Sequence, residues 1–135
     1  MAMKFSVAVR NSELDAIETA IGATAVLKIR TGAPPTNIAD ADTGTVLATL
    51  TLPSDWLAAA AAGVKAKAGT WQDLVADAPG DAGHFRIYAS DGTTQHIQGT
   101  VTATGGGGDM TLDNISIAAG QTVTITTFQL TAGNP

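Results

Sequence analysis

The sequence contains no cysteine, and aromatic residues make up only 4% of its 135 residues. The lack of cysteine excludes a disulfide framework, a thiolate metal site and a cysteine nucleophile. Large apolar side chains are also scarce, because alanine supplies much of the 44% hydrophobic content and buries little area per residue. A thin core favours a protein that gains stability from contacts between subunits, so we expect self-association.

Positive charge is scarce as well. The formal net charge is −5, the seven basic residues are scattered along the chain, and none follows Arg86. Nucleic-acid interfaces draw much of their affinity from clustered lysine and arginine, so we expect no nucleic-acid partner. The longest apolar run, Trp56 to Gly63, is far shorter than the ~20 residues of a membrane span. The apolar run within residues 1–10 is too short for a signal peptide, and we expect no membrane association.

Hydrophobic periodicity predicts a short helix near the N-terminus. Ser12 is a candidate N-cap, and Gly22 follows the last apolar residue at helical spacing. Residues 1–10 form a candidate extended N-terminal arm. A few helical turns are also expected over residues 56–63, because alanine has a high helix propensity. A short strand is predicted before the first helix from the alternating residues Phe5, Val7 and Val9.

Most of the remaining chain has the alternation and turn residues of β-strands. Residues 32–44 and 73–83 combine proline, glycine and aspartate, and are expected to be exposed loops. Lysines at alternate positions of the predicted strand 64–71 point outward, as on a protected sheet edge. The predicted strands are residues 25–30, 45–52, 64–71, 84–89, 94–101, 110–117 and 122–131.

Two of these strands are expected to form a hairpin through the turn Ser90 to Thr93. Its outward residues include His84, Arg86 and Tyr88. The glycine run at 105–108 is expected to be a flexible connector. In the last strand the inward parity changes near Thr126, which favours a β-bulge there over a strand whose two halves pack on different surfaces, one within the molecule and one between subunits.

These elements predict one domain over residues 1–135, an antiparallel β-sandwich of six or seven strands with one short N-terminal helix. A small barrel is the alternative architecture.

No catalytic or cofactor-binding residues emerge from the sequence. His84 and His96 lie on paired arms of the predicted hairpin with Asp91 between them, but surface histidines are the preferred interpretation over a metal site. Asp40 and Asp42 resemble the opening of a calcium loop, although Thr51 stands where an EF-hand has its bidentate glutamate. The glycine run lacks the Lys-Ser/Thr and helix of a phosphate loop. We therefore expect a protein that is not an enzyme and needs no metal or cofactor.

Two readings of the sparse aromatic residues remain open. Trp56 and Trp71 are core anchors or, alternatively, anchors of a subunit interface. An exposed platform for a carbohydrate or receptor would use the tryptophans with His84, Tyr88 and His96. The candidate interface residues are Phe5, Trp56, Trp71, His84, Tyr88 and His96.

Four segments, LDAIETAIG, TLTLPSDW, GHFRIYASDGTTQHIQGTV and GGGGDMTLDNISIAAGQTVTIT, resemble small proteins encoded among the virion genes of tailed bacteriophages. The resemblance covers nearly the whole chain and implies a β-rich virion component that decorates or stabilises the capsid. It implies assembly in the host cytoplasm, a homo-oligomer with a trimer favoured, and partners that include the major capsid protein. Contacts are then expected from residues 1–10 and from loops 31–43 and 73–83, because loops and termini reach neighbouring subunits.

Overall fold

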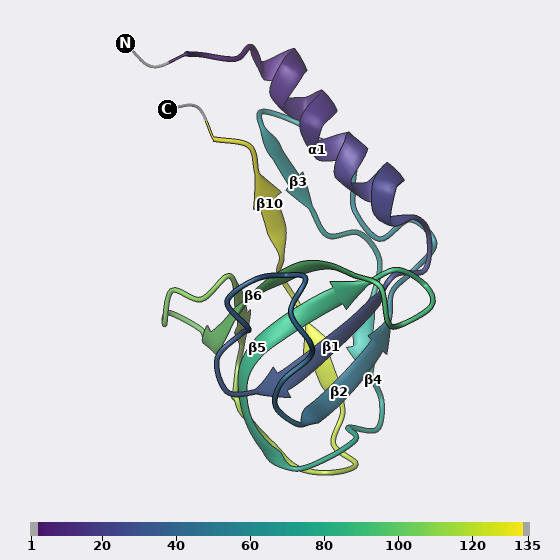
Figure 1. The fold of residues 1–135 in the computed structure, drawn as a ribbon, viewed down its shortest axis with the longest axis vertical. Helices are drawn as coiled ribbons and strands as arrows, with labels where there is room; N and C mark the ends of the chain where they lie inside the picture. The colour runs from purple at the N-terminus through teal and green to yellow at the C-terminus, as the bar shows by residue number, and fades with distance from the viewer. Residues whose placement is uncertain (1–2, 134–135) are drawn as a thin grey trace.

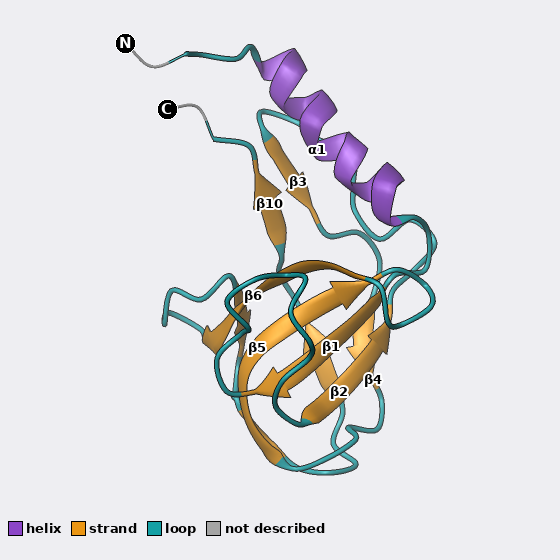
Figure 2. Cartoon of the chain, viewed as in Figure 1, coloured by secondary structure: helices purple, strands orange, loops and turns teal. Residues whose placement is uncertain are grey.

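The computed structural model describes residues 3–133, which are mainly β with one helix at the N-terminal end (Figures 1 and 2). The strands form a curled half-barrel sheet and two smaller sheets, so the predicted β-sandwich or barrel class is confirmed. Ten strands are present in these residues where six or seven were expected, because three of the seven predicted strands are each divided into two.

The helix α1 spans Val7–Ile21 and begins earlier than predicted. Ser6 is its N-cap, and the Ser6 side chain accepts a hydrogen bond from the Val9 amide at 3.2 Å. The predicted short strand through Val7 and Val9 is therefore wrong, and residues 7–10 of the expected arm are helical. Residues 1–2 lie outside the described part of the chain. The helix α1 is neither long enough nor apolar enough to span a membrane.

The main sheet has the strand order β2-β1-β5-β6-β7, and β8 pairs with the start of β5. Neighbouring strands are antiparallel except for β6 and β7. The predicted strands 25–30 and 45–52 and the hairpin through Ser90 to Thr93 are present. The strands of this sheet are β1 (Val26–Thr31), β2 (Val46–Thr51), β5 (Gly80–Tyr88), β6 (Gln95–Ala103), β7 (Met110–Leu112) and β8 (Ser116–Ile117).

The two smaller sheets divide the C-terminal strand between them. β9 (Val123–Ile125) pairs with β4 (Trp71–Asp73), whereas β10 (Gln129–Thr131) pairs with β3 (Val64–Ala66). The predicted bulge near Thr126 is therefore wrong. The two halves pack on different surfaces, as in the alternative, but both surfaces belong to the same chain and neither is a contact between subunits. Figure 1 shows β3, β10 and α1 standing beside the half-barrel, and we call these three elements the lobe.

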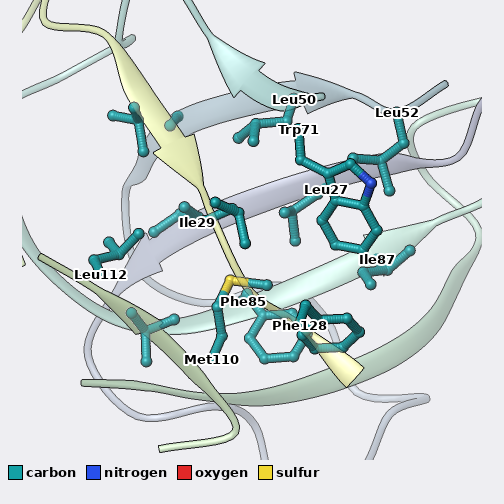
Figure 3. Packing of buried hydrophobic residues seen from close by; sticks show 14 of the residues in the cluster. Leu27, Ile29, Leu50, Leu52, Trp71, Phe85, Ile87, Met110, Leu112 and Phe128 are labelled. Atoms are coloured by element: carbon teal, nitrogen blue, oxygen red, sulfur yellow. The ribbon is translucent and has the colours of Figure 1, made fainter. Parts of the chain in front are cut away.

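The core lies between the inner face of the main sheet and the β4–β9 pair (Figure 3). Four aromatic rings run through it in contact, with Trp71 placed 5.9 Å from Trp56 and 5.4 Å from Phe128 between ring centroids, and Phe128 placed 5.7 Å from Phe85. Both indoles are satisfied, because Trp56 donates to the Gly22 carbonyl and Trp71 to the Ala68 carbonyl. Of the two interpretations of the tryptophans, core anchors and interface anchors, the first is therefore confirmed.

The alanine-rich segment 56–63 is not helical. Its residues pair with the strand that follows, through bridges between Leu57 and Lys67 and between Ala61 and Val64. Ala62 and Gly63 both have positive φ, as a tight two-residue hairpin turn requires. Helix propensity is a weak preference, and it is outweighed here by the burial of Trp56 and Leu57 in the core.

The glycine run at 105–108 builds a compact turn that places β7 parallel to β6, where antiparallel strands were expected. Gly105 and Gly107 have positive φ, and a Cβ on Gly106 or Gly108 would lie within 3 Å of Thr102. The chain can double back in so few residues because these positions carry no side chain. The Gly108 amide also donates to the Thr102 hydroxyl at 3.0 Å, which holds the turn in place.

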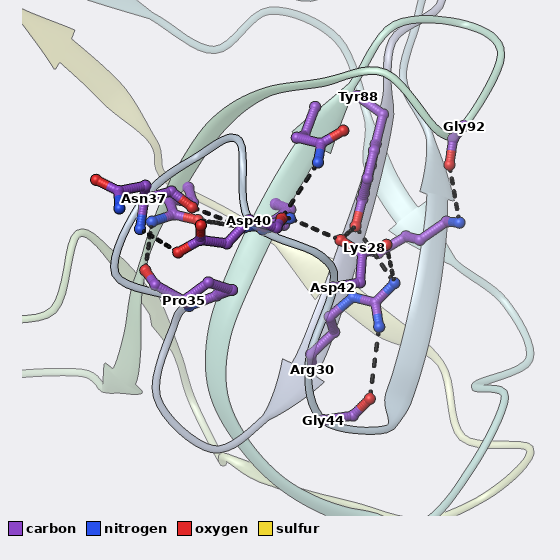
Figure 4. A network of polar contacts seen from close by, with 12 residues as sticks. Lys28, Arg30, Pro35, Asn37, Asp40, Asp42, Gly44, Tyr88 and Gly92 are labelled. Carbon is purple, nitrogen blue, oxygen red and sulfur yellow. Dashed lines mark hydrogen bonds and ion pairs between the residues drawn. The ribbon is translucent and has the colours of Figure 1, made fainter.

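The loop at 32–44 folds back over the outer face of β1 and β5 (Figure 4). His84, Arg86 and Tyr88 were expected on an exposed outer face, but each is 0% exposed. The sequence pattern places these three side chains correctly on the outer face of the sheet, but it does not predict that the 32–44 loop covers that face. The backbones of loop and sheet touch at Gly83, where a Cβ would lie 2.3 Å from the Gly32 oxygen.

We expect Gly83→Ala to destabilise the protein by about 2 kcal/mol, because the added methyl must push the 32–44 loop off the sheet. The free energy of unfolding in urea measures this loss. Gly133→Ala is the matched control, since no atom lies within 4 Å of a Cβ there. Equal stability of the two variants would contradict the close packing of Gly83 against Gly32.

Candidate interaction surface

The six candidate interface residues fall into two groups in the structure. Four of them, Trp56, Trp71, His84 and Tyr88, are 0% exposed and offer no surface to a partner. Their assignment to an interface or to an exposed carbohydrate platform is therefore wrong. Phe5 is 41% exposed and His96 is exposed.

Asp42 of the 32–44 loop, whose side chain is 36% exposed, is the centre of a charge cluster between this loop and the main sheet (Figure 4). Its carboxylate accepts hydrogen bonds from Arg30 at 2.9 Å, from Arg86 at 2.9 Å and from the Tyr88 hydroxyl at 2.7 Å. The Arg86 side chain is 0% exposed and that of Arg30 is 8% exposed. Two guanidinium groups are thus taken out of water with Asp42 as their shared counterion.

The remaining donors of Arg86 bind the loop and the neighbouring strand. Arg86 donates to the carbonyl oxygens of Asp40 at 2.9 Å and Asn37 at 3.3 Å, and to the Gln98 side chain at 2.8 Å. Gln98 in turn donates to the Pro35 carbonyl at 2.7 Å. One arginine therefore connects β5, β6 and the 32–44 loop.

Burial and hydrogen bonding have opposite effects on the cluster's ionisation. Burial alone would raise the pKa of Asp42, but hydrogen bonds from Tyr88 and Arg86 and the charges of both arginines lower it overall. Burial, together with the hydrogen bond to Asp42, raises the pKa of Tyr88. Asp42 therefore stays ionised and Tyr88 stays protonated at neutral pH, and the cluster is suited to holding the loop.

The calcium interpretation of Asp40 and Asp42 is wrong for these side chains. The Asp42 oxygens are occupied by two arginines and a tyrosine, and a cation would have to displace positive charge. The Asp40 carboxylate accepts a hydrogen bond from the Asn37 amide at 2.9 Å within the loop. Across residues 3–133, no group of three or more histidine, aspartate or glutamate side chains is placed to hold a metal ion.

The two histidines do not meet. His84 pairs with Thr100 in the sheet register, whereas His96 lies near the hairpin turn at a break in the register. His84 Nδ1 lies 2.8 Å from the Gly32 carbonyl oxygen and is therefore the protonated nitrogen, while Nε2 is buried without a partner among the described residues. Burial, with the charges of Arg30 and Arg86, lowers the pKa of His84.

Lys65 on β3 joins the helix α1 to the hairpin formed by residues 57–67. Its side chain is 3% exposed, and its ammonium lies 2.7 Å from Asp15 and 3.0 Å from Glu18 on α1. Burial would lower the pKa of Lys65, but hydrogen bonds to these two carboxylates raise it. The prediction that lysines of this strand point outward is wrong for Lys65, because α1 covers that face. Both acidic residues were visible in the sequence as helix positions without an assigned partner.

The N-terminal end of α1 extends beyond the hairpin that supports it. The last anchors are Asn11, which accepts from the Gly63 amide at 2.9 Å, and Arg10, which donates to the Ala132 carbonyl at 3.3 Å. Residues 3–9 are all exposed, and we call this segment the overhang (Figure 1). Its apolar side chains are Met3 at 76% exposure, Phe5 at 41%, Val7 at 47% and Val9 at 45%.

A second apolar surface lies at the other end of α1. A groove of about 300 Å³ opens between the helix, β6 and β10. Away from the helix, Leu74 and Val75 in the 73–83 segment are each 64% exposed. The larger hollow beside the glycine turn is lined mostly by threonine, glycine and charged residues. The groove residues are Ile17, Ala20, Ile21, His96, Ile97 and Leu130.

Replacement of Asp42 by asparagine is expected to destabilise the protein by about 3 kcal/mol, because two buried arginines lose their counterion. Urea denaturation at pH 7.5 measures the change. Asp81→Asn removes an exposed carboxylate on β5 and should change stability by less than about 0.5 kcal/mol. Similar losses in the two variants would contradict the central role of Asp42.

The free energy of unfolding should fall as the pH is lowered from 7.5 to 5. The unfolded chain protonates His84 near its ordinary pKa of 6.5, whereas the folded chain does so only at lower pH. The slope from this group is at most about 1.4 kcal/mol per pH unit. In His84→Asn, whose amide can still donate to Gly32, this dependence should disappear. His96→Asn should retain it, and a retained slope in His84→Asn would show that another group is responsible.

Comparisons with protein-family models, with curated proteins and with solved structures found no match to this chain.

Proposed function

We propose that this chain is a non-catalytic structural component of a bacteriophage virion. In this role it decorates or stabilises the capsid through contacts with its own copies and with the major capsid protein. The virion setting follows from the resemblance of the sequence to small proteins of tailed bacteriophages. The mode of action follows from the distribution of polar and apolar side chains over the described residues.

The observation that carries the proposal is the overhang. Its side chains Met3, Val7 and Val9 lie before Arg10 and Asn11, which hold α1 to the body, and they are between 45% and 76% exposed. Apolar side chains gathered at one exposed end of a small protein are typical of a surface that is covered by a partner. The exposed Leu74 and Val75 lie away from the helix, so they allow the overhang to be compared with another exposed apolar pair.

The charged groups of the body have structural partners, which fits a scaffold. Arg30, Asp42 and Arg86 hold the 32–44 loop, and Lys65 with its two carboxylates holds α1. A catalytic acid or base needs access to a substrate, and these buried pairs are instead committed to packing. The 32–44 loop, one of the expected contact regions, has an exposed outer side that remains free for a neighbouring subunit.

Self-association is the first consequence to test. Sedimentation velocity at micromolar concentration should show an oligomer for the intact chain. Val7→Ser combined with Val9→Ser should weaken the association at least tenfold, because burial of a valine contributes roughly 1.5 kcal/mol. Leu74→Ser combined with Val75→Ser is the control for a general loss of apolar surface, and circular dichroism checks that α1 is retained.

A monomer for the intact chain, or equal weakening in both double variants, would contradict a role for the overhang in self-association. The virion assignment has its own measurement. Mass spectrometry of purified phage particles should find the chain at a copy number comparable with that of a capsid protein. Absence of the chain from purified particles would overturn the assignment.

A further inference from the structure

We propose that the overhang of one copy docks in the apolar groove of a second copy, so that the subunits associate head to tail. This inference rests on the proposed function, and it names the partner and the geometry of the same surface. The two surfaces lie at opposite ends of α1, with Val7 in the overhang and Ile17 and Ala20 in the groove.

The overhang continues the buried stripe of the helix. Val7 lies two turns before Leu14 and four turns before Ile21 on the same face, because residues seven apart nearly coincide around an α-helix. Leu14 is 3% exposed and Ile21 is 8% exposed, whereas Val7 is 47% exposed. The stripe therefore runs past the end of the hairpin that covers it, and its last position lacks cover within the described chain.

The groove has the chemistry to receive such side chains. Five of its six lining residues are apolar, and His96 at its edge is the polar one. Ile17, Ile97 and Leu130 are each only partly buried against the core. A volume of about 300 Å³ is at the small end of protein pockets, which suits one or two apolar side chains better than a whole helix face.

The charges near the two surfaces are opposite. Lys4 is the ionisable side chain of the overhang, whereas Glu13 lies on the helix face that leads to Ile17 and Ala20. Neither Lys4 nor Glu13 forms an ion pair within residues 3–133. Because the whole chain has a net charge of −5, most faces of two copies repel, and a cationic segment near an acidic helix face is a favoured approach.

The occupant is a second copy because the helix separates the two surfaces within one chain. From Val7 to Ile17 the helix rises roughly 15 Å. The chain enters the helix in an extended conformation at Ser6, and Figure 1 shows it leading away from the body. A contact between two different surfaces is heterologous, and it closes into a ring when the rotation between subunits allows.

Cysteine cross-linking tests this geometry cleanly, because the natural chain has no cysteine. Two variants, Val7→Cys and Ala20→Cys, each place one thiol at an exposed position. A short bismaleimide added to an equal mixture should yield covalent dimers at least tenfold faster than either variant alone. The double variant should give a ladder of covalent oligomers that ends at the size of the ring. Val75→Cys mixed with Ala20→Cys is the control for random collision.

Efficient dimers from Val7→Cys alone would overturn the proposal in favour of a head-to-head contact. Equal yields with Val75→Cys would overturn it in favour of nonspecific collision. The outcome is separable from that of the proposed function. A chain that is present in particles but gives no mixed cross-link keeps its virion role and loses this geometry, whereas mixed cross-links from a chain absent from particles keep the geometry alone.

Discussion

The ion pairing of Asp42 with two buried arginines is the constraint on which the covered face of the main sheet depends. Arg30 and Arg86 project from adjacent strands, and water is replaced around them by the 32–44 loop. A buried guanidinium without a counterion is strongly unfavourable, so the loop and the charge pair require each other. With the loop in place, His84 and Tyr88 become interior residues, and a face that looks polar in sequence becomes part of the folded body.

The lobe follows the same rule on a smaller scale. A polar contact, Lys65 with Asp15 and Glu18, complements the apolar packing of Leu14 and Ile21 and sets the position of α1 along the hairpin. Apolar packing alone allows a helix to slide, whereas charged hydrogen bonds have one best register. That register leaves residues 7–9 of α1 exposed, whereas Arg10 still donates to the Ala132 carbonyl. The exposed overhang is thus a consequence of where the helix is anchored, and it is the surface from which the proposed function is argued.

The sequence predicts the β class, the hairpin through Ser90 to Thr93 and the strands at 25–30 and 45–52, because those features depend on residues near one another in the chain. It fails where distant segments decide the outcome. The outward positions of Arg86 and Tyr88 are buried by a loop some 45 residues away, and alternation within a strand carries no information about such a cover. The helix predicted over residues 56–63 is wrong for the same reason, because burial of Trp56 in the core outweighs the weak helix propensity of the alanines. Of the candidate interface residues, Phe5 and His96 are exposed, and His96 belongs to the groove.

The division of the C-terminal strand has a mechanical consequence. β9 is held in the barrel by β4, β10 is held in the lobe by β3, and only residues 126–128 join them, with Phe128 inserted among the core aromatics. Tension applied to the lobe would pass through this short link to the Phe128 ring, and also through residues 67–70, which join β3 to β4. Both links enter one antiparallel pair at the same end, where Trp71 lies opposite Ile125. A pull would therefore draw β4 and β9 together, and the load would fall on the packed rings of Trp71 and Phe128.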